Sequence, residues 1–388
     1  MKTLTVMVCA VTLVLGFTSC NTGGEPDGDP NLEILSQAVP QYVNHTVIAT
    51  YTALADETIA LHDALTALKA SKAAGNDQEA TANLQAAADK WLAARHHWEL
   101  SEAFLYGAAG DFGIDPHIDT WPLDRTALEV LLNNNDNISS MDSEDGVAWA
   151  GEYLGSSLLG FHGIEYILFV DGAKKNASAI TNNELIYAVA VSGDLRNQCI
   201  RLEAAWAGYD NVSEEKQAVI DDFELGITIG NNASYGADMI NAGKTGSTYI
   251  SVLDAVEALL EGCVTIADEV GTLKIGQPYS GEDVNYIESP YSYNSLIDFV
   301  DNIESIRNAY LGGADAAARG VSVSDYFKKV NVTLDGRVIA AIDNAVAKIQ
   351  AIQHPFFSNY ASSQAGEAVE ACDELASVLT EAKNALRE

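Results

Sequence analysis

The sequence predicts an all-α protein made of two helical bundle domains. Apolar residues recur at intervals of three and four along most of the chain, as on one face of a helix, and no segment alternates like a strand. Only 8 of the 388 residues are proline, which also favours helices over a sheet sandwich. A chain of this length exceeds the size at which one core usually keeps growing, so two domains are expected. The two halves have similar helix counts, which suggests an ancient duplication, although no residue-level repeat proves it.

The N-terminus has the pattern of an export signal. Lys2 precedes an apolar run that is too short to span a membrane, and small residues then lead to Cys20. We expect residues 1–19 to be a lipoprotein signal peptide, Cys20 to carry the lipid, and residues 20–30 to form an acidic flexible tether. Simple secretion is the alternative. The expected location is the cell envelope, anchored at the outer membrane and facing either the periplasm or the surface.

The N-terminal bundle is expected over residues 31–210. Helical periodicity and glycine breaks predict its helices at residues 32–70, 78–106, 124–132, 146–170 and 182–209. Pro116 and Pro122 predict that the 115–122 segment is a shaped, non-helical loop. A polar stretch at 133–145 connects two of the helices.

The C-terminal bundle is expected over residues 211–388. It begins with a segment rich in Gly and Asn, residues 223–248, which predicts irregular structure, either a lid or a long connection. Helices are then predicted at residues 248–271, 292–311, 334–352 and 367–387. A loop that bears Gly and Tyr separates the first two of them.

The chain is strongly acidic, with a formal net charge of −34, and removal of the signal with its single cation, Lys2, would make this −34 − 1, or −35. Phosphate contacts need Lys and Arg, so nucleic acid and anionic lipid headgroups are excluded as partners by charge. The acidity suits binding of cations, and a role in keeping the protein soluble explains it equally well.

Among five cysteines, Cys199, Cys263 and Cys372 are scattered singly, so no thiolate metal site or redox motif is expected and at most one disulfide can form.

The stretch from Gly160 to Glu165 has the clearest chemical potential. His162 and Glu165 are three residues apart, so on a helix their side chains lie on one side and can converge on one metal ion or proton. Most flanking residues are aromatic or aliphatic, which predicts that the pair points inward, where an isolated charge is costly. For this pair alone, an equally good explanation of the buried polar groups is that His162 and Glu165 bond to each other or to nearby backbone.

Two other segments supply candidate ligands. On the second predicted helix, Glu99 and Glu102 lie close to one face with two tryptophans, where a surface ion pair with Arg95 is the alternative. In the following loop, Asp119 is the better ligand candidate, whereas Asp115 fits a turn-forming role. One imidazole with carboxylates makes a mixed nitrogen and oxygen site, suited to iron, zinc or manganese. Motifs of zinc peptidases (HExxH), serine hydrolases (GxSxG), covalent haem proteins and phosphate loops do not occur.

Residues Gly160 to Glu165 match a GxHxxE signature, and the chain resembles the imelysin-like family. These are helical envelope proteins once grouped as insulin-cleaving metallopeptidases and linked to iron regulation and uptake. The resemblance extends over most of residues 31–388, with its sharper patterns in the helix from Trp91, the 115–122 loop, and the segments 288–292 and 302–312.

The resemblance implies two helical bundles with a functional site near their junction, where a divalent or trivalent metal binds, iron being favoured and zinc an alternative. Carried over residue by residue, the metal ligands would be Glu99, Glu102, Asp119, His162 and Glu165. A polar cluster without metal is the alternative.

Three functions follow as hypotheses. The first is a lipid-anchored envelope protein that holds iron, another metal or a metal-bearing ligand such as haem for uptake, together with an envelope transport partner. The second is a metal-dependent peptidase, with Glu99 or Glu102 as base; it is weaker because HxxE supplies one histidine where peptidase helices supply two. The third is a protein or peptide docking module whose polar cluster only fixes domain geometry.

Overall fold

The computed structural model describes residues 30–230 and 232–387, and in this part of the chain the protein is all-α. The strands in these residues are β1 (Phe169–Val170) and β2 (Ala173–Lys174), each two residues long. They pair antiparallel, with Phe169 opposite Lys174. The expected fold class is therefore confirmed. The predicted signal peptide and nearly all of the tether lie outside the described residues.

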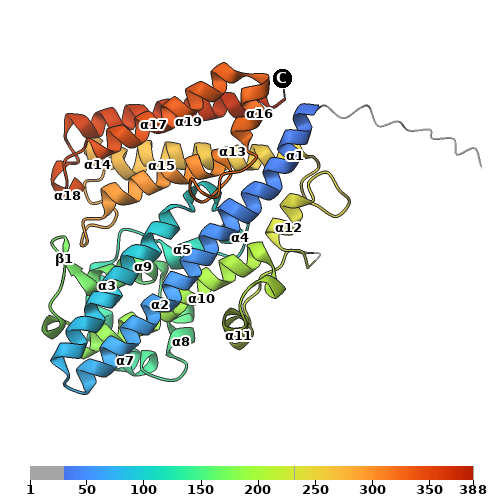
Figure 1. The fold of residues 1–388 in the computed structure, drawn as a ribbon. Helices are drawn as coiled ribbons and strands as arrows, with labels where there is room; N and C mark the ends of the chain where they lie inside the picture. Colours follow the sequence, from blue (N-terminus) through green and yellow to red (C-terminus); the bar gives the residue numbers. More distant parts are fainter. Residues whose placement is uncertain (1–29, 231, 388) are drawn as a thin grey trace, which may run out of the picture.

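The helices form two layers (Figure 1). The first contains α2 (Ile48–Ala73), α3 (Asp77–Glu99), α8 (Gly146–Tyr153), α9 (Gly160–Leu168) and α10 (Asn182–Ala207). The second contains α13 (Val252–Glu269), α15 (Ser295–Leu311), α16 (Val323–Val330), α17 (Val332–Gln350) and α19 (Ser363–Ala385). Short helices fill the connections: α4 (Ala108–Asp111), α5 (Asp115–Ile118), α6 (Arg125–Leu132), α7 (Asn135–Met141), α11 (Glu214–Asp222), α12 (Tyr235–Ile240), α14 (Gly276–Ser280) and α18 (Phe356–Asn359).

The first helix joins the two layers. Helix α1 (Pro30–Tyr42) runs through a π-helical segment, Val43–Val47, directly into α2. It contacts α13 and α16 of the second layer, whereas α2 packs against α3 and α10 of the first (Figure 1). The domain boundary near residue 210 stays a prediction, with the addition that α1 lies spatially beside the C-terminal half.

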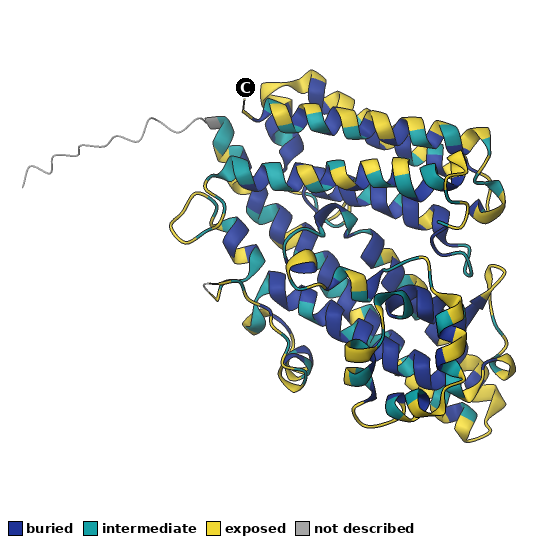
Figure 2. Cartoon of the chain, turned by 180° about the vertical axis from the view of Figure 1, so that it is seen from behind, coloured by how far each residue is buried: buried dark blue, intermediate teal, exposed yellow. Residues whose placement is uncertain are grey.

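Helix α10 is the central element of the first layer. It begins at a capping box, in which Thr181 and Glu184 exchange bonds between side chain and backbone. Most of its residues are buried, because α2, α8 and α9 pack around it. Figure 2 shows the general pattern, in which the helix faces turned inward are buried and those turned outward are exposed. In the second layer, buried faces of α13, α15, α17 and α19 meet in the same way.

Several sequence-based boundaries differ from the structure. The helix expected at 78–106 ends at Glu99, and a 3₁₀ turn follows at Glu102–Phe104. The 115–122 loop contains one helical turn, α5, because Pro116 occupies a first-turn position where its missing N–H costs nothing. The polar stretch 133–145 contains α7, whose first turn is capped by Asn134. Helix α16 is an element that the sequence analysis did not place.

The remaining cysteines, Cys199, Cys263 and Cys372, are free and buried, as expected of packed thiols. Among the described residues, no helix is both long and apolar enough to cross a bilayer.

Candidate metal centre

The helix expected at 146–170 is broken, and this break positions the GxHxxE stretch. Between α8 and α9 the chain leaves helical geometry, with Leu159 extended and Gly160 at φ +69°. A Cβ on Gly160 would lie 2.0 Å from the carbonyl oxygen of Ile118. Only glycine allows this approach, so α9 starts directly against the segment that carries Asp119.

A second glycine sets how α9 packs on α10. A Cβ on Gly163 would lie 2.0 Å from Oη of Tyr187, and this hydroxyl donates to the carbonyl oxygen of Leu158 at 2.7 Å. The glycine between His162 and Glu165 therefore serves close helix packing, and it fixes the direction in which both side chains leave α9.

Asp119 follows α5 and is held by two donors from α3. Its Oδ2 accepts from Nε1 of Trp98 at 2.8 Å, and its Oδ1 accepts from Nη1 of Arg95. Burial favours the neutral acid, but Arg95 and His162 outweigh it and hold the pKa of Asp119 well below its usual range. Asp119 is therefore a buried, ionised carboxylate.

Arg95 occupies the centre of the cluster with 0 % side-chain exposure. Its guanidinium pairs with four carboxylates: Asp119, Glu288, Glu99 at 2.5 Å and Asp298 with 3.5 Å from Nε. Burial disfavours its charge, yet these acids raise the pKa of Arg95 further. The alternative of a surface ion pair between Arg95 and Glu99 is wrong, because both side chains are fully buried.

Lys274 is a second buried cation. It lies in a π-helical segment after α13, Val270–Ile275, and its Nζ is 3.2 Å from Oε2 of Glu288, 3.6 Å from Oε2 of Glu99 and 3.8 Å from Oε1 of Glu102. Burial raises the pKa of both Glu99 and Glu102, although Arg95 and Lys274 lower the first and Lys274 the second. These two predicted ligands therefore lie beside cations, and Asn302 also donates to Glu99 at 2.5 Å.

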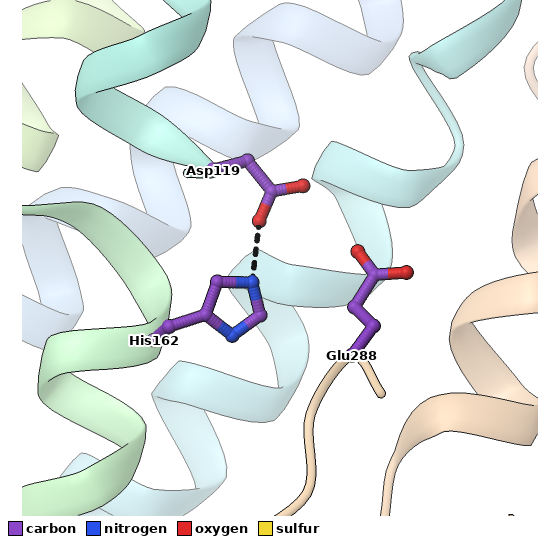
Figure 3. A group of neighbouring side chains, drawn as sticks. All are labelled: Asp119, His162 and Glu288. Atoms are coloured by element: carbon purple, nitrogen blue, oxygen red, sulfur yellow. Dashed lines mark ion pairs between the residues drawn. The ribbon is translucent and has the colours of Figure 1, made fainter. Parts of the chain in front are cut away.

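His162 points into the same cluster and faces Asp119 and Glu288 (Figure 3). Its Nε2 lies 3.0 Å from Oδ1 of Asp119, an ion-pair distance, but makes no hydrogen bond of good geometry. Its Nδ1 is 3.5 Å from Glu165. Burial disfavours the imidazolium, but Asp119 and Glu165 raise the pKa of His162 to about 9.

Glu165 has a different role from His162. Its Oε1 accepts hydrogen bonds from the backbone N–H of Tyr291 at 3.0 Å, and from the N–H and hydroxyl of Ser292 at 2.8 and 2.7 Å. It thus ties α9 to the loop before α15. The structure places this predicted ligand at the edge of the cluster.

Glu288, like Lys274, is a residue of the cluster that no sequence pattern predicted as part of the site. It is fully buried, its Oε1 accepts from Nη2 of Arg95, and its Oε2 has no hydrogen-bond partner. Its neighbour Ser289 donates to Asp298 at 2.5 Å. The only sequence signal was the resemblance of the 288–292 segment to a family pattern, because nothing in local spacing links it to residue 162.

Two groups of side chains converge closely enough to hold an ion among the described residues. They are Asp119, His162 and Glu288, and separately Glu99, Glu102 and Asp119, with one ligand atom from each residue within 4.8 Å of the others in its group. The first group fits a first-row metal in composition, since it offers an imidazole nitrogen and carboxylate oxygens. Two buried atoms of this group, Nε2 of His162 and Oε2 of Glu288, also make no hydrogen bond, although ion-pair partners lie 3.0 and 3.2 Å away. Arg95 and Lys274 compete with an ion for the carboxylates.

A cavity of about 590 Å³ opens beside the cluster, with His162 in its lining. Trp121, Tyr166 and Tyr291 form part of its wall. The ring of Trp121 is 6.3 Å from that of His162, and Nζ of Lys274 lies 5.1 Å from the centre of the Trp121 ring. The buried cluster therefore lies behind an aromatic cavity at the junction of the two layers.

Comparisons with known proteins agree on one family. A family model described as Imelysin (Peptidase_M75) matches residues 47–382. The chain is 26% identical over 361 residues to iron-regulated protein A of Synechococcus elongatus, covering 93% of this chain and 86% of the relative.

Among solved structures, the chain is similar to a candidate iron-regulated protein A precursor from Parabacteroides distasonis. The TM-score is 0.75 at 29% identity, with 94% of this chain and 96% of that chain covered. It also shares its fold with an imelysin-like protein from Psychrobacter arcticum, with a TM-score of 0.63 at 14% identity over 89% and 93% of the two chains.

Proposed function

Because this chain belongs to the imelysin family, we propose that it is a binding protein that holds a metal cation at Asp119, His162 and Glu288. Iron is the favoured metal, because relatives that match nearly the full length carry the name iron-regulated protein A. Zinc is the alternative that the same donor atoms suit.

The observation that carries this proposal is the convergence of three donor atoms, one each from Asp119, His162 and Glu288, within 4.8 Å of one another. Buried polar atoms in folded proteins nearly always have hydrogen-bond partners. Here Nε2 of His162 and Oε2 of Glu288 make no hydrogen bond, although Asp119 lies 3.0 Å from the first and Nζ of Lys274 lies 3.2 Å from the second. A metal ion that displaces the proton of His162 and the ammonium group of Lys274 would bind both atoms. Arg95 and Lys274 keep part of the carboxylate charge compensated, so the site also suits a metal that brings its own anionic ligands.

Binding is favoured over catalysis by the contacts of Glu165. Its Oε1 is engaged by two backbone N–H groups and a hydroxyl, which leaves it a positioning residue for the 288–292 segment. The cluster also offers one imidazole, whereas the zinc peptidase helix motif supplies two histidines. Chelator-sensitive cleavage of a protein substrate that is lost in Glu165→Gln would support the peptidase hypothesis instead.

Two parts of the proposed function rest on sequence alone. The lipid on Cys20 and a location in the cell envelope stay predictions, because residues 1–29 lie outside the described residues. They are compatible with a role in iron uptake beside an envelope transport partner.

The test is metal content. Purified protein incubated with iron(II) or zinc and then desalted is expected to carry about one metal ion per chain by elemental analysis. His162→Ala and Glu288→Gln are each expected to weaken binding about a hundredfold, since each removes a ligand. The matched control is His117→Ala. His117 also lies 3.0 Å from a carboxylate, that of Asp194, but outside the cluster, so this variant should bind like the wild type.

The docking hypothesis gives a different result in the same experiment. If the cluster only fixes geometry, His162→Ala lowers the unfolding midpoint while the wild type and all variants carry no metal. Absence of stoichiometric metal in the wild type, with an unchanged midpoint after metal addition, would sink the metal proposal.

A further inference from the structure

The cavity beside His162 differs in charge from the rest of the molecule. Its lining includes Arg125, Lys175, His162 and one acid, Asp171, in a chain whose formal net charge is −34. Its volume of about 590 Å³ lies within the range of sites for small organic ligands. We propose that this cavity binds a small aromatic carboxylate, with its ring between the aromatic walls and its carboxylate at Arg125 and Lys175. This inference goes beyond the proposed metal site and needs no metal.

Both cations lie against the ring of Tyr166. The guanidinium carbon of Arg125 lies 5.5 Å from the centre of the Tyr166 ring, and Nζ of Lys175 lies 4.8 Å from it. Each cation has one long acidic contact in the structure: Nη2 of Arg125 donates to Oε1 of Glu129 at 3.5 Å, and Nζ of Lys175 lies 3.9 Å from Oε1 of Glu184. Both cations therefore keep donors available for a ligand.

The surroundings of Lys175 favour an anion. Burial lowers the pKa of Lys175, because its ammonium group has lost part of its hydration. A ligand carboxylate would replace that hydration, and the planar guanidinium of Arg125 can donate two parallel hydrogen bonds to a carboxylate. The exposed Asp171 disfavours an anion, but it is one acid against two cations in the lining.

The other walls suit an aromatic ring. Tyr166 and Tyr291 meet edge to face at 5.1 Å, and Tyr293 stacks on Phe357 at 6.4 Å. These rings come from α9, from the loop before α15 and from α18, so both layers contribute to the cavity. Aromatic pairs prefer such offset and edge contacts, which a flat ligand ring can extend.

The mouth of the cavity exposes apolar side chains. Three lining residues, Val170, Val284 and Phe357, are 47%, 43% and 51% exposed. Apolar side chains that gather at the mouth of a cavity mark a place where a ligand excludes water. The combination of apolar mouth, aromatic walls and paired cations specifies a ligand with one flat apolar part and one negative charge.

The test uses metal-free protein, so that it is separate from the proposed function. Chelator-treated full-length protein is titrated by calorimetry with 2-naphthoate, with the neutral 2-naphthamide and with the non-aromatic decahydro-2-naphthoate. We expect 2-naphthoate to bind about tenfold more tightly than either comparison ligand, because the amide lacks the charge and the saturated ring lacks the flat face.

Variants assign the site. Arg125→Gln combined with Lys175→Gln is expected to weaken 2-naphthoate binding at least about tenfold, since both charge-assisted contacts are lost. The control, Lys174→Gln combined with Arg337→Gln, changes the net charge equally. Lys174 and Arg337 do not line the cavity, so binding should stay within about twofold.

Three results would overturn the inference: no binding of 2-naphthoate at millimolar concentration, equal binding of the amide, or equal loss in the control variant. Metal content distinguishes this outcome from failure of the proposed function. Arg125→Gln with Lys175→Gln should keep its metal, whereas His162→Ala should lose it.

Discussion

At the scale of single residues, Arg95 determines the character of the cluster. It pairs with carboxylates from α3, the segment after α5, the loop before α15, and α15 itself. Removing one partner of a buried ion pair costs about 3–5 kcal/mol, because the remaining charge is left uncompensated. Most of this buried charge is therefore compensated without a metal ion. Metal analysis measures whether the cluster binds an ion in addition.

A second residue, His62 on α2, predicts a pH dependence of stability. Burial lowers the pKa of His62 to about 4, and Arg196 acts in the same direction. Its pKa in the unfolded chain is about 6.5, so the unfolded state takes up the proton first as the pH falls. This group therefore costs stability below pH 6.5, increasingly down to about pH 4.

The measurement is urea unfolding of the wild type and His62→Gln at pH 7 and pH 5. The wild type should lose about 2 kcal/mol more than the variant over this interval. Buried acids whose pKa is raised, such as Asp298 with a pKa of about 7, have the opposite effect: they increase the stability of the folded state as the pH falls. They are present in both proteins and cancel in the difference. An equal loss in both proteins would contradict the assignment.

At the scale of elements, the start of α9 depends on two glycines. Apolar periodicity runs through residues 146–170 without a break, and it predicted one helix there. The structure has two helices, α8 and α9, because Gly160 must approach the carbonyl oxygen of Ile118 and Gly163 must approach Tyr187. This tertiary requirement outweighs local helix propensity.

Gly163→Ala tests this packing. Replacing a glycine inside a helix by alanine usually stabilises by about 0.5–1 kcal/mol. At Gly163 the added Cβ would meet Oη of Tyr187 at 2.0 Å, so we expect destabilisation by about 1–3 kcal/mol. The matched control is Gly336→Ala in α17, where nothing lies within 4 Å of the added atom and stabilisation is expected. Thermal or urea unfolding measures both, and stabilisation by Gly163→Ala would contradict the role given to this glycine.

At the scale of the whole molecule, the buried cluster joins the two layers. Arg95, Glu99, Asp119 and His162 come from the first layer, while Lys274, Glu288 and Asp298 come from the second. Unfolding of either layer alone would leave buried charges of the other without partners, which is costly. The two bundles should therefore unfold together.

The tryptophans allow this cooperativity to be measured. All five, Trp91 to Trp206, lie within the predicted N-terminal bundle, residues 31–210, whereas far-ultraviolet circular dichroism reports helices of both bundles. We expect the urea midpoints from fluorescence and from dichroism to coincide in one transition. Two separate midpoints would show that the cluster does not couple the layers.

The candidate site could be predicted from the sequence only in part. Glu99, Asp119 and His162 were predicted because each lies in a patterned segment, and the structure brings them together around Arg95. Glu165 was grouped with them by spacing, but its carboxylate binds the 291–292 backbone. Glu288 and Lys274 were missed, because they are distant in sequence from residue 162 and no local spacing links them to it.

The sequence by itself determined the all-α class, most helix positions and the inward direction of His162, because periodic burial of apolar side chains is a local property that spacing reveals. Only the tertiary structure decided which charges meet. The layers bring Arg95, Lys274 and Glu288 to His162 from positions up to 193 residues apart, as between Arg95 and Glu288. Charge compensation in a buried site depends on distances of a few ångströms between such segments, and no local pattern encodes them.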